Sequence, residues 1–321
     1  MTSWTGSTGS REGTSRACIR TLKCDLCGRP SISKELPTGR PLCEKHFLKS
    51  IWKRASEEIK GIKGPILLSV SGGKDSLVLM DVMSNIYDPS ELVALTVVEG
   101  AEGYEREEER RNACLLAKKL GIEYNYVTFK DLYGKKLSEM VKVGKQRPCT
   151  YCGVFRRRAV EMVALKLGIR NVATGHTLDD EVHTSFLNLL RGDWDGIAKL
   201  AHGRLKPLRR VFEKEVAVYA YIRKFPLQKK ECPYLDLNPS LRSRVRVKLF
   251  DLVEENPSKL YKWSMKMKEL RRESEERGTC ERCGFPTSPG RRICRACELA
   301  EEVGAKVPTI DEAEKITLRS C

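Results

Sequence analysis

The chain has little of what a membrane or secreted protein needs. None of its hydrophobic runs approaches the roughly 20 residues that cross a bilayer as a helix. Residues 1–17 are rich in Ser, Thr and Gly and lack the apolar core of a signal peptide. We therefore predict no membrane association, a cytoplasmic location, and a disordered tail over 1–17.

Acidic residues are outnumbered, since Asp and Glu total 43 against 59 Lys and Arg, which leaves a formal net charge of +16. A soluble protein this basic usually has a polyanionic partner, and nucleic acid is the first candidate. Hydrophobic residues still make up 40% of the chain, enough for a sizeable core. The composition therefore favours a folded protein that binds nucleic acid.

Cysteine is abundant, with 13 residues, and in a reducing compartment clustered Cys indicates metal or redox chemistry rather than a disulfide scaffold. Two groups have the spacing of closed, four-ligand zinc sites: Cys24, Cys27, Cys43 and His46, and then Cys280, Cys283, Cys294 and Cys297. A closed site leaves no position for substrate, so we assign both a scaffolding role, with presentation of an RNA-binding surface as a secondary one. Cys114 is predicted to lie in the core, on the apolar stripe of a helix.

Between these modules, compact apolar runs alternate with helical patterns. The predicted strands cover 65–70, 92–98, 124–129 and 171–173, and the predicted helices cover 76–86, 102–120, 153–167 and 178–190. The second of these helices carries Leu115, Leu116 and Leu120 on its apolar stripe. Alternation of this kind predicts an α/β fold with a doubly wound parallel sheet covered on both faces.

The motif Ser71-Gly72-Gly73-Lys74-Asp75-Ser76 directly follows the first predicted strand and opens a helix. The two glycines let backbone amides turn toward an anion, and the helix N-terminus adds partial positive charge. Lys74 can neutralise phosphate, both serines can donate to it, and Asp75 can help to hold Mg²⁺. The spacing is not that of a Walker A loop, and the alternative is a Ser/Gly turn without a ligand.

The fourth predicted strand leads into Gly175-His-Thr-Leu-Asp-Asp-Glu181, a second loop that opens a helix. Its carboxylates, Asp179 and Asp180, could act at a metal or at phosphates, or could simply cap the helix. The two histidines of this region, His176 and His183, could be structural or functional.

Three further cysteines lie outside the zinc groups. Cys149 and Cys152 form a Cys-x-x-Cys pair at a helix N-terminus, a position that lowers thiol pKa values, and Cys232 is distant in sequence. One pair plus one distant Cys fits a three-thiolate [4Fe–4S] cluster with one iron left open. It also fits a redox pair that carries a persulfide, and the remaining alternative is a structural thiol set or half of a zinc site.

These motifs occur in an order that resembles the tRNA 2-thiouridine synthetases, a family within the PP-loop ATP pyrophosphatases. The likeness covers residues 22–297 and rests on the two zinc modules, SGGKDS, PCTYCGVFRRR, GHTLDDE and a lone downstream Cys. It implies that Cys149, Cys152 and Cys232 hold a [4Fe–4S] cluster. Ser69 and Val97 would bracket the adenosine of ATP, and Asp180 would act at the metal or the phosphates. The rest of the implied ATP and Mg²⁺ site is Ser71, Gly72, Gly73, Lys74, Asp75, Ser76 and Gly175.

The same resemblance implies ATP-dependent adenylation of the O2 atom of a tRNA uridine, release of pyrophosphate, and replacement of the oxygen by sulfur as AMP leaves. The sulfur donor would be a thiocarboxylated ubiquitin-like protein or free sulfide, and a homodimer is a possible assembly. The CTYCGVFRRR motif is more similar to the branch that acts on the wobble uridine. The branch that acts on the T-loop includes enzymes with Lys in place of Arg156.

These motifs also divide the chain. We predict zinc modules at 18–50 and 278–300, a catalytic domain over 51–203, a basic helical tRNA-binding region over 204–277 that carries Cys232, and a tail over 301–321. Helices are predicted over 213–224 and 241–276 in the basic region. Stretches that could bind tRNA phosphates, or form solvated helix faces, are 156–158, 204–210, 223–230 and 242–248.

Two other functions compete with thiolation. An ATP-dependent ligase or amidotransferase of the same superfamily would share the SGGKDS loop but would not need the three central cysteines. A zinc-ribbon RNA-binding adaptor with a vestigial nucleotide site would show no turnover of ATP to AMP.

Overall fold

The computed structural model describes residues 22–104, 106–193, 204–226, 232–234, 245, 247–249, 251, 255–269 and 278–321. The predicted tail over 1–17 lies outside the described residues, as do much of the predicted helix 241–276 and of the basic stretches 223–230 and 242–248. Within that helix, α11 (Pro257–Glu269) is observed. In the described part of the chain, no helix combines the length and apolarity that crossing a membrane requires.

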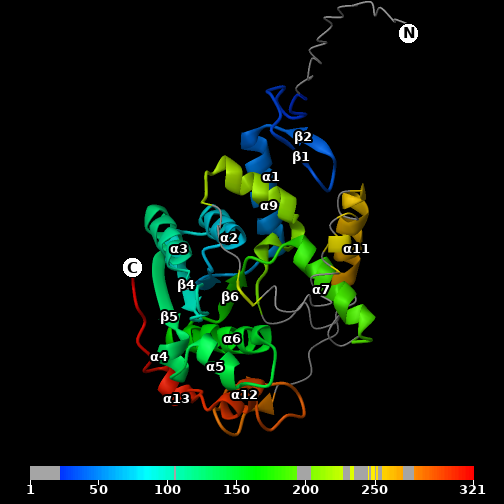
Figure 1. Ribbon diagram of the computed structural model, residues 1–321. Coiled ribbons are helices and arrows are strands. Elements are labelled where there is room, and N and C mark those ends of the chain that lie inside the picture. Colours follow the sequence, from blue (N-terminus) through cyan, green and yellow to red (C-terminus); the bar gives the residue numbers. More distant parts are fainter. Residues whose placement is uncertain are drawn as a thin grey trace, which may run out of the picture.

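A four-stranded parallel sheet forms the centre of the molecule (Figure 1). Its strands are β3 (Ile66–Ser69), β4 (Leu92–Val98), β5 (Glu123–Thr128) and β6 (Asn171–Thr174), in the order β5-β4-β3-β6. All neighbours run parallel. The chain adds β4 and β5 on one side of β3 and then β6 on the other, so the predicted doubly wound parallel sheet is confirmed, with its switch point between β3 and β6.

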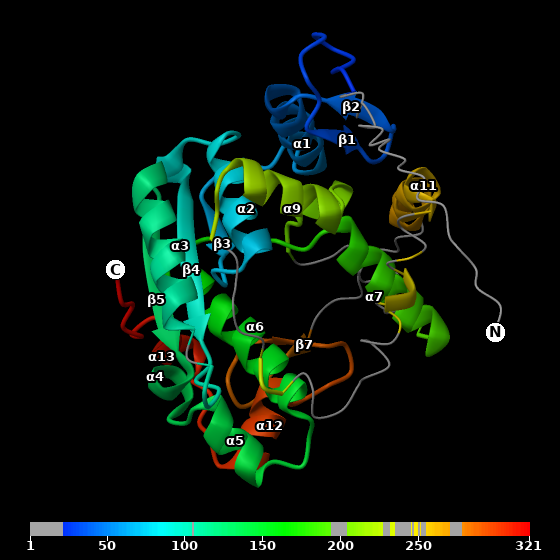
Figure 2. The ribbon, with the colours of Figure 1, turned by 45° about the horizontal axis from the view of Figure 1, so that its top comes forward.

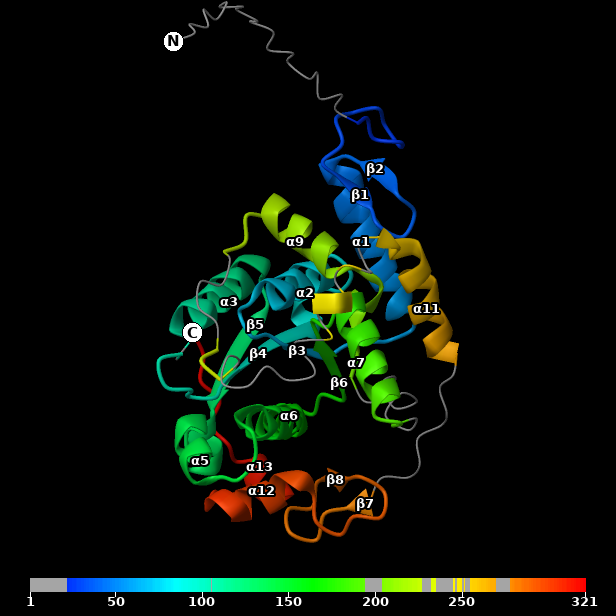
Figure 3. The same cartoon turned by 45° about the vertical axis from the view of Figure 1, so that its right-hand side comes forward.

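Helices cover both faces of this sheet (Figure 3). Alternate residues of β3 point to opposite faces, so Leu67 packs with α6 (Pro148–Lys166), whereas Ile66 and Leu68 pack with α2 (Lys74–Ser84). The face of α2 is also covered by α3 (Glu107–Leu120) and α9 (Glu213–Ile222), and that of α6 by α4 (Phe129–Tyr133) and α5 (Leu137–Val143). The result is two cores separated by one sheet.

Each cysteine module extends one of these two cores. The first module has strands β1 (Ser33–Glu35) and β2 (Arg40–Leu42) and helix α1 (Glu44–Glu58), whose apolar residues join the core on the α2 face. The second has β7 (Gly278–Thr279), β8 (Pro286–Thr287), α12 (Arg295–Val303) and α13 (Ile310–Ala313), which join the core on the α6 face. The modules therefore lie at opposite ends of the molecule (Figure 1).

The remaining elements lie beside the sheet or connect its strands. Helix α7 (Leu178–Leu190) follows β6, and it lies alongside α11 (Figure 2). Two short 3₁₀ helices, η1 (Pro89–Glu91) and η2 (Pro207–Arg210), precede β4 and α9. Helix η2 packs against both α1 and α7, so it connects the first module to the loop that follows β6.

A buried ion pair ties the first module to α9. Both guanidinium nitrogens Nη1 and Nη2 of Arg54 lie 2.8 Å from carboxylate oxygens of Glu215, and Nη1 also donates to the carbonyl of Arg210 at 2.9 Å. Arg54→Met would leave a buried carboxylate without its cation, so we expect the free energy of unfolding to fall by about 3–5 kcal/mol in denaturant titration. As a matched control, Arg282→Met breaks an exposed pair with Glu301 and should cost less than about 1 kcal/mol. Equal losses in the two variants would contradict this assignment.

Helix α3 differs from its sequence prediction at both its start and its apolar stripe. It begins at Glu107 rather than at residue 102, because Gly103 and Arg106 have positive φ angles of 74° and 56°, which interrupt helical backbone. Leu115, predicted on the apolar stripe, is 57% exposed, so that prediction is wrong. Leu116 and Leu120 do pack against the core.

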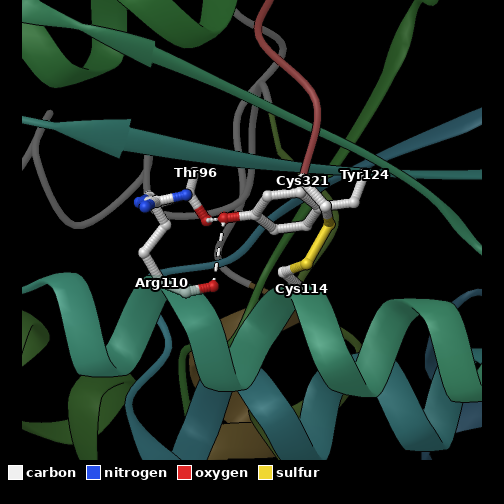
Figure 4. The surroundings of a disulfide bond; sticks show 5 residues. All are labelled: Thr96, Arg110, Cys114, Tyr124 and Cys321. Atoms are coloured by element: carbon white, nitrogen blue, oxygen red, sulfur yellow. Dashed lines mark hydrogen bonds between the residues drawn. A yellow bond between two sulfur atoms is a disulfide. The ribbon is translucent and has the colours of Figure 1, made fainter.

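The C-terminal segment is tied to the edge of the sheet. Arg319 exchanges two backbone hydrogen bonds with Tyr126 of β5, at 2.7 and 3.1 Å, and its side chain pairs with Asp131 at 2.8 Å. Cys321 forms a disulfide with Cys114, beside the ring of Tyr124 (Figure 4). Cys114, predicted as a core residue, thus lies half-buried beside the core as half of a cross-link, and this disulfide was not predicted.

The disulfide should stabilise the protein because it closes a long loop. Its cysteines are 207 residues apart, and cross-links over such separations stabilise by about 2–5 kcal/mol through the unfolded state. We expect Cys114→Ser to lower the melting temperature of the oxidised protein by roughly 10 °C, as measured by calorimetry without reductant. Cys321→Ser and the double variant should show the same decrease. An additive decrease in the double variant would contradict a shared bond.

Candidate functional site

Two loops meet at the switch point of the sheet. Ser71–Gly73 connects β3 to α2, and Gly175–Thr177 connects β6 to α7. They approach so closely that a Cβ atom on Gly175 would lie 2.9 Å from the carbonyl oxygen of Asp75. Ligands of open α/β sheets bind at this edge, so the local geometry fits a ligand site.

The first loop has the backbone that an anion requires. Gly72 has φ +80°, and a Cβ atom there would lie 2.2 Å from the carbonyl oxygen of Glu109 on α3. Gly73 is the N-cap of α2 and makes no side-chain cap hydrogen bond, so the helix N-terminus is open to an anion. The hydroxyl oxygens of Ser71 and Ser76 lie 3.3 Å apart at its entrance.

A cavity of about 290 Å³ opens between these loops. Seven of the predicted site residues line it: Ser69, Ser71, Asp75, Ser76, Val97, Gly175 and Asp180. Five further charged or polar residues contribute, namely Glu99, Arg156, Thr174, His176 and Arg204. The prediction gave Glu99, Arg156, Thr174 and Arg204 no place at a nucleotide pocket and left His176 undecided.

Lys74 does not line the cavity in this structure. Its Nζ atom lies 2.8 Å from Oδ1 of Asp75 and 3.1 Å from Oε1 of Glu213 on α9. Burial raises the pKa of Asp75, and the charge of Lys74 acts against this shift. The lysine is therefore held by two carboxylates and would have to leave them to contact a phosphate in the cavity.

The two aspartates of the second loop have different surroundings. Asp180 lines the cavity and also closes a capping box with Thr177, whose amide donates to Oδ2 at 3.0 Å. The geometry therefore fits both roles considered for Asp180, capping of the helix and action at a metal or at phosphates. Asp179 accepts a hydrogen bond from the amide of Glu213 at 2.6 Å, and burial raises its pKa to about 6.

The Cys-x-x-Cys pair lies at the start of α6, which begins at Pro148, so its predicted place at a helix N-terminus is confirmed. The helical pattern 153–167 is the continuation of this helix. Cys149 is exposed, whereas burial raises the pKa of the half-buried Cys152 to about 11. Cys149 and Cys232 both act electrostatically on Cys152, so the structure brings all three thiols into one region.

This donor set suits an iron–sulfur cube better than a single ion. Among the described residues, only the two zinc-type groups have ligand atoms that all lie within 4.8 Å of one another, and the three central cysteines are not among them. A cube is wider than one ion, and three thiolates leave one of its irons without a protein ligand.

Arg156 joins the cavity to the thiols, a role that the sequence did not reveal. Its Nη2 atom donates to Sγ of Cys152 at 3.3 Å, and it forms an ion pair with the buried carboxylate of Glu99, which follows β4. On the other side of Glu99 lies Arg106, whose Nη2 donates to the carbonyl of Ser71 at 2.6 Å. A line of charges therefore runs from the phosphate loop to the thiols. The position of Glu99 directly after a buried strand was the one available signal.

Both zinc-type groups have tetrahedral spacing. In the first, Sγ of Cys27 and Cys43 lie 3.6 Å apart, and Nδ1 of His46 lies 3.3 Å from Sγ of Cys24. In the second, Cys283 and Cys294 are 3.6 Å apart and Cys280 and Cys297 are 3.9 Å apart. These distances match the roughly 3.8 Å between ligand atoms around Zn²⁺. Each group could hold one tetrahedral metal ion.

Much of the basic stretch 204–210 is engaged inside the protein. Lys206 pairs with Glu181, Arg209 with Glu181 and Glu58, and Arg210 with Glu57 and Glu58. These cations hold η2 between α1 and α7, so their charges are largely neutralised before any RNA binds. In 156–158, Arg158 is buried against Phe285 while Arg157 is exposed.

The fold and the loop at its switch point define a PP-loop protein, and the profile of the PP-loop domain family matches residues 46–232. The chain belongs to the family of the tRNA 2-thiolation proteins. It is 34% identical to tRNA 2-thiolation protein NcsA of Haloferax volcanii, over 88% of this chain and 100% of the relative. It is 32% identical to cytoplasmic tRNA 2-thiolation protein 1 of Xenopus laevis, over 90% of each chain.

A solved structure has the same architecture over nearly its whole length. The U34-tRNA thiolase NcsA from Methanococcus maripaludis, determined with its [4Fe–4S] cluster, superimposes with a TM-score of 0.78 at 30% sequence identity. The match covers 91% of this chain and 99% of that chain. The resemblance inferred from the motif order, including membership of this family, is therefore confirmed.

Proposed function

We propose that this protein is an ATP-dependent tRNA sulfurtransferase that converts the wobble uridine to 2-thiouridine. The observation that carries the proposal is Arg156, which lines the nucleotide cavity and also donates to Sγ of Cys152. One side chain thus contacts both the site where ATP would activate an oxygen and the site where sulfur would be delivered. The related NcsA, a U34-tRNA thiolase, supports the wobble position over the T-loop.

The cavity residues have natural roles toward Mg-ATP. Ser71, Ser76 and the open N-terminus of α2 would bind phosphates, and Ser69 and Val97 would bracket the adenosine. Asp75 and Asp180 would hold Mg²⁺, and Lys74 would leave Glu213 to neutralise phosphate charge. Gly72, Gly73 and Gly175 would permit the close backbone approach that this arrangement needs.

Cys149, Cys152 and Cys232 would hold the [4Fe–4S] cluster. When bound, the cluster supplies an iron that has no protein ligand and is open to sulfur. The two outer groups, Cys24, Cys27, Cys43 and His46 and then Cys280, Cys283, Cys294 and Cys297, would each hold a structural Zn²⁺.

The protein's own residues would prepare the oxygen for departure. The phosphate loop would orient the α-phosphate of ATP toward O2 of the uridine, so that pyrophosphate leaves and the oxygen becomes part of a good leaving group. Arg156 and Arg204 would stabilise the negative charge that develops in the cavity as AMP departs. The target base must leave its stack to reach this centre.

We further propose a thiocarboxylated ubiquitin-like protein or free sulfide as sulfur donor, a cytoplasmic location and, as a possible assembly, a homodimer. The domain limits proposed from the sequence are 51–203 for catalysis, 204–277 for tRNA binding, and 18–50 and 278–300 for the zinc modules. Helices α1, α12 and α13 extend the two modules beyond residues 50 and 300. The cytoplasmic name of the Xenopus laevis relative supports the location.

Binding of tRNA should depend strongly on salt because the chain carries a net charge of +16. Between 50 and 200 mM salt we expect the affinity to fall by roughly 10³-fold, as for a protein with about six phosphate contacts. Filter binding with unmodified tRNA measures this directly. A flat response would count against phosphate contacts by the basic stretches.

The function itself is tested by turnover. Protein reconstituted with iron and sulfide without oxygen is incubated with unmodified tRNA, Mg-ATP and sulfide, and AMP, pyrophosphate and nucleosides are quantified. We expect AMP and 2-thiouridine in equal amounts, both dependent on tRNA. A nitrogen-containing adduct would favour the ligase or amidotransferase, and absence of AMP formation would favour the RNA-binding adaptor.

A further inference from the structure

The second zinc module contacts the Cys-x-x-Cys turn through one carboxylate. Tyr151 lies between the two cysteines of that turn, and its side chain is fully buried in the core that α6 shares with the module. Its hydroxyl donates to Oε1 of Glu302 on α12 and accepts from the amide of Gln146 at 2.9 Å. The same carboxylate oxygen accepts the amide of Lys145 at 2.6 Å. Glu302 and Tyr151 together therefore bind two successive amides of the loop that enters α6.

Further hydrogen bonds join the two ends of this loop to the adjacent helices: the amide of Gly144 donates to the carbonyl of Met140 at 2.9 Å, and that of Thr150 donates to the carbonyl of Arg147 at 2.8 Å. The N-cap of α6, Arg147, makes no side-chain cap hydrogen bond. The loop is instead packed onto the tyrosine, since a Cβ atom on Gly144 would lie 2.2 Å from the hydroxyl oxygen. Because Cys149 follows within two residues of Arg147, the position of its sulfur depends on where the loop enters the helix.

Glu302 lies on a helix whose start carries two ligands of the second zinc-type group. Helix α12 starts with the ligands of the second group, since Cys294 is its N-cap and Cys297 lies in its first turn. Glu302 is five residues beyond Cys297, about 7.5 Å along the same helix. A metal ion that fixes the start of α12 therefore also fixes the carboxylate that holds the loop.

We propose that Glu302 is a positioning residue for Cys149, acting through Tyr151 and the loop 144–147. The second zinc module thereby sets the spacing of Cys149 from Cys152. The inference rests on the proposed function only in taking Cys149 as a cluster ligand. The link between module and loop stands without it.

The test compares Glu302→Ala and Tyr151→Phe with Glu301→Ala, a matched control. Glu301 is the preceding residue of α12 and pairs with Arg282 inside the module, away from the loop. In the protein without cluster, hydrogen–deuterium exchange of residues 144–149 should be roughly 5-fold faster in both test variants, the factor expected for loss of one such hydrogen bond. Zinc content, measured in the same samples, should stay at the wild-type value.

With the cluster reconstituted, the two test variants should lose iron to a chelator roughly 10-fold faster than wild type, as is typical when a group that orients a metal ligand is removed. Their kcat for thiolation should fall while KM for ATP stays unchanged, because neither residue lines the nucleotide cavity. Glu302→Gln should restore both properties, since its amide oxygen can still accept both hydrogen bonds.

Wild-type exchange and iron loss in Tyr151→Phe would overturn the proposal, as would equal effects in Glu301→Ala. If Glu302→Ala fails to fold, Tyr151→Phe still decides, because it removes a single oxygen. If the two test variants exchange faster in the loop but even the wild-type protein thiolates no tRNA, the proposed function is contradicted. The positioning role of Glu302 is then still supported.

Discussion

Cys149→Ser is expected to lower the rate of 2-thiouridine formation by roughly 10³-fold, because catalytic groups that act as a unit lose most of their effect together. A serine oxygen replaces the soft thiolate that iron requires, and two thiolates cannot hold the cluster in its place. The affinity for ATP should not change, since Cys149 does not line the nucleotide cavity. Nucleoside mass spectrometry measures the first quantity and calorimetric titration the second.

The matched control for this variant is Cys321→Ser, because Cys321 is the disulfide partner of Cys114 on α3 and does not line the nucleotide cavity. It should lower the melting temperature but leave the thiolation rate unchanged below that temperature. Wild-type activity in Cys149→Ser would refute the role of the central cysteines and favour the ligase.

Gly72→Ala should remove nucleotide binding almost entirely. The residue has φ +80°, and the added Cβ atom would lie 2.2 Å from a backbone oxygen of α3, which has no flexible end to yield. The loop must then shift, and a displacement of about 1 Å at a reacting group can cost roughly 10²-fold in activity. Pyrophosphate release and ATP affinity should fall together by at least this factor.

Gly168→Ala separates the effect of backbone strain at a positive φ angle from the effect of the clash between the added Cβ atom and α3. Gly168 also has a positive φ, +65°, but nothing lies within 4 Å of its added Cβ atom. The variant should lose about 1 kcal/mol of stability from backbone strain alone and keep its ATP affinity. Equal loss of ATP affinity in both variants would show that the contact with α3 is not what fixes the loop.

The sheet and its two loops were predictable because local patterns encode them. The strand 92–98 was placed without error, and the helix 178–190 likewise, since buried apolar runs and capping residues mark their ends. The start of α6 was predictable from Pro148 and the Cys-x-x-Cys pair, whereas the apolar period of that helix begins only at residue 153. The helix start at Glu107 was missed because a positive φ at a non-glycine residue leaves no trace in the pattern.

The residues of the site also divide into those that local sequence patterns predicted and those that they did not. Residues within the two contiguous motifs were found, and most of them line one cavity. Glu99 and Arg156 were missed as a pair because their contact joins two distant segments, and neither has a neighbour in sequence that would suggest a partner. The disulfide and the internal ion pairs of η2 were missed for the same reason.

The most direct test of the account is the fate of labelled sulfur. The reconstituted protein is given ³⁴S-sulfide, Mg-ATP and an unmodified tRNA with a wobble uridine, and the digested fragments are weighed. We expect ³⁴S in the anticodon fragment alone, as one 2-thiouridine for each AMP formed. Label in the T-loop fragment would refute the wobble assignment, and AMP formation without any sulfur in the tRNA would contradict the central claim.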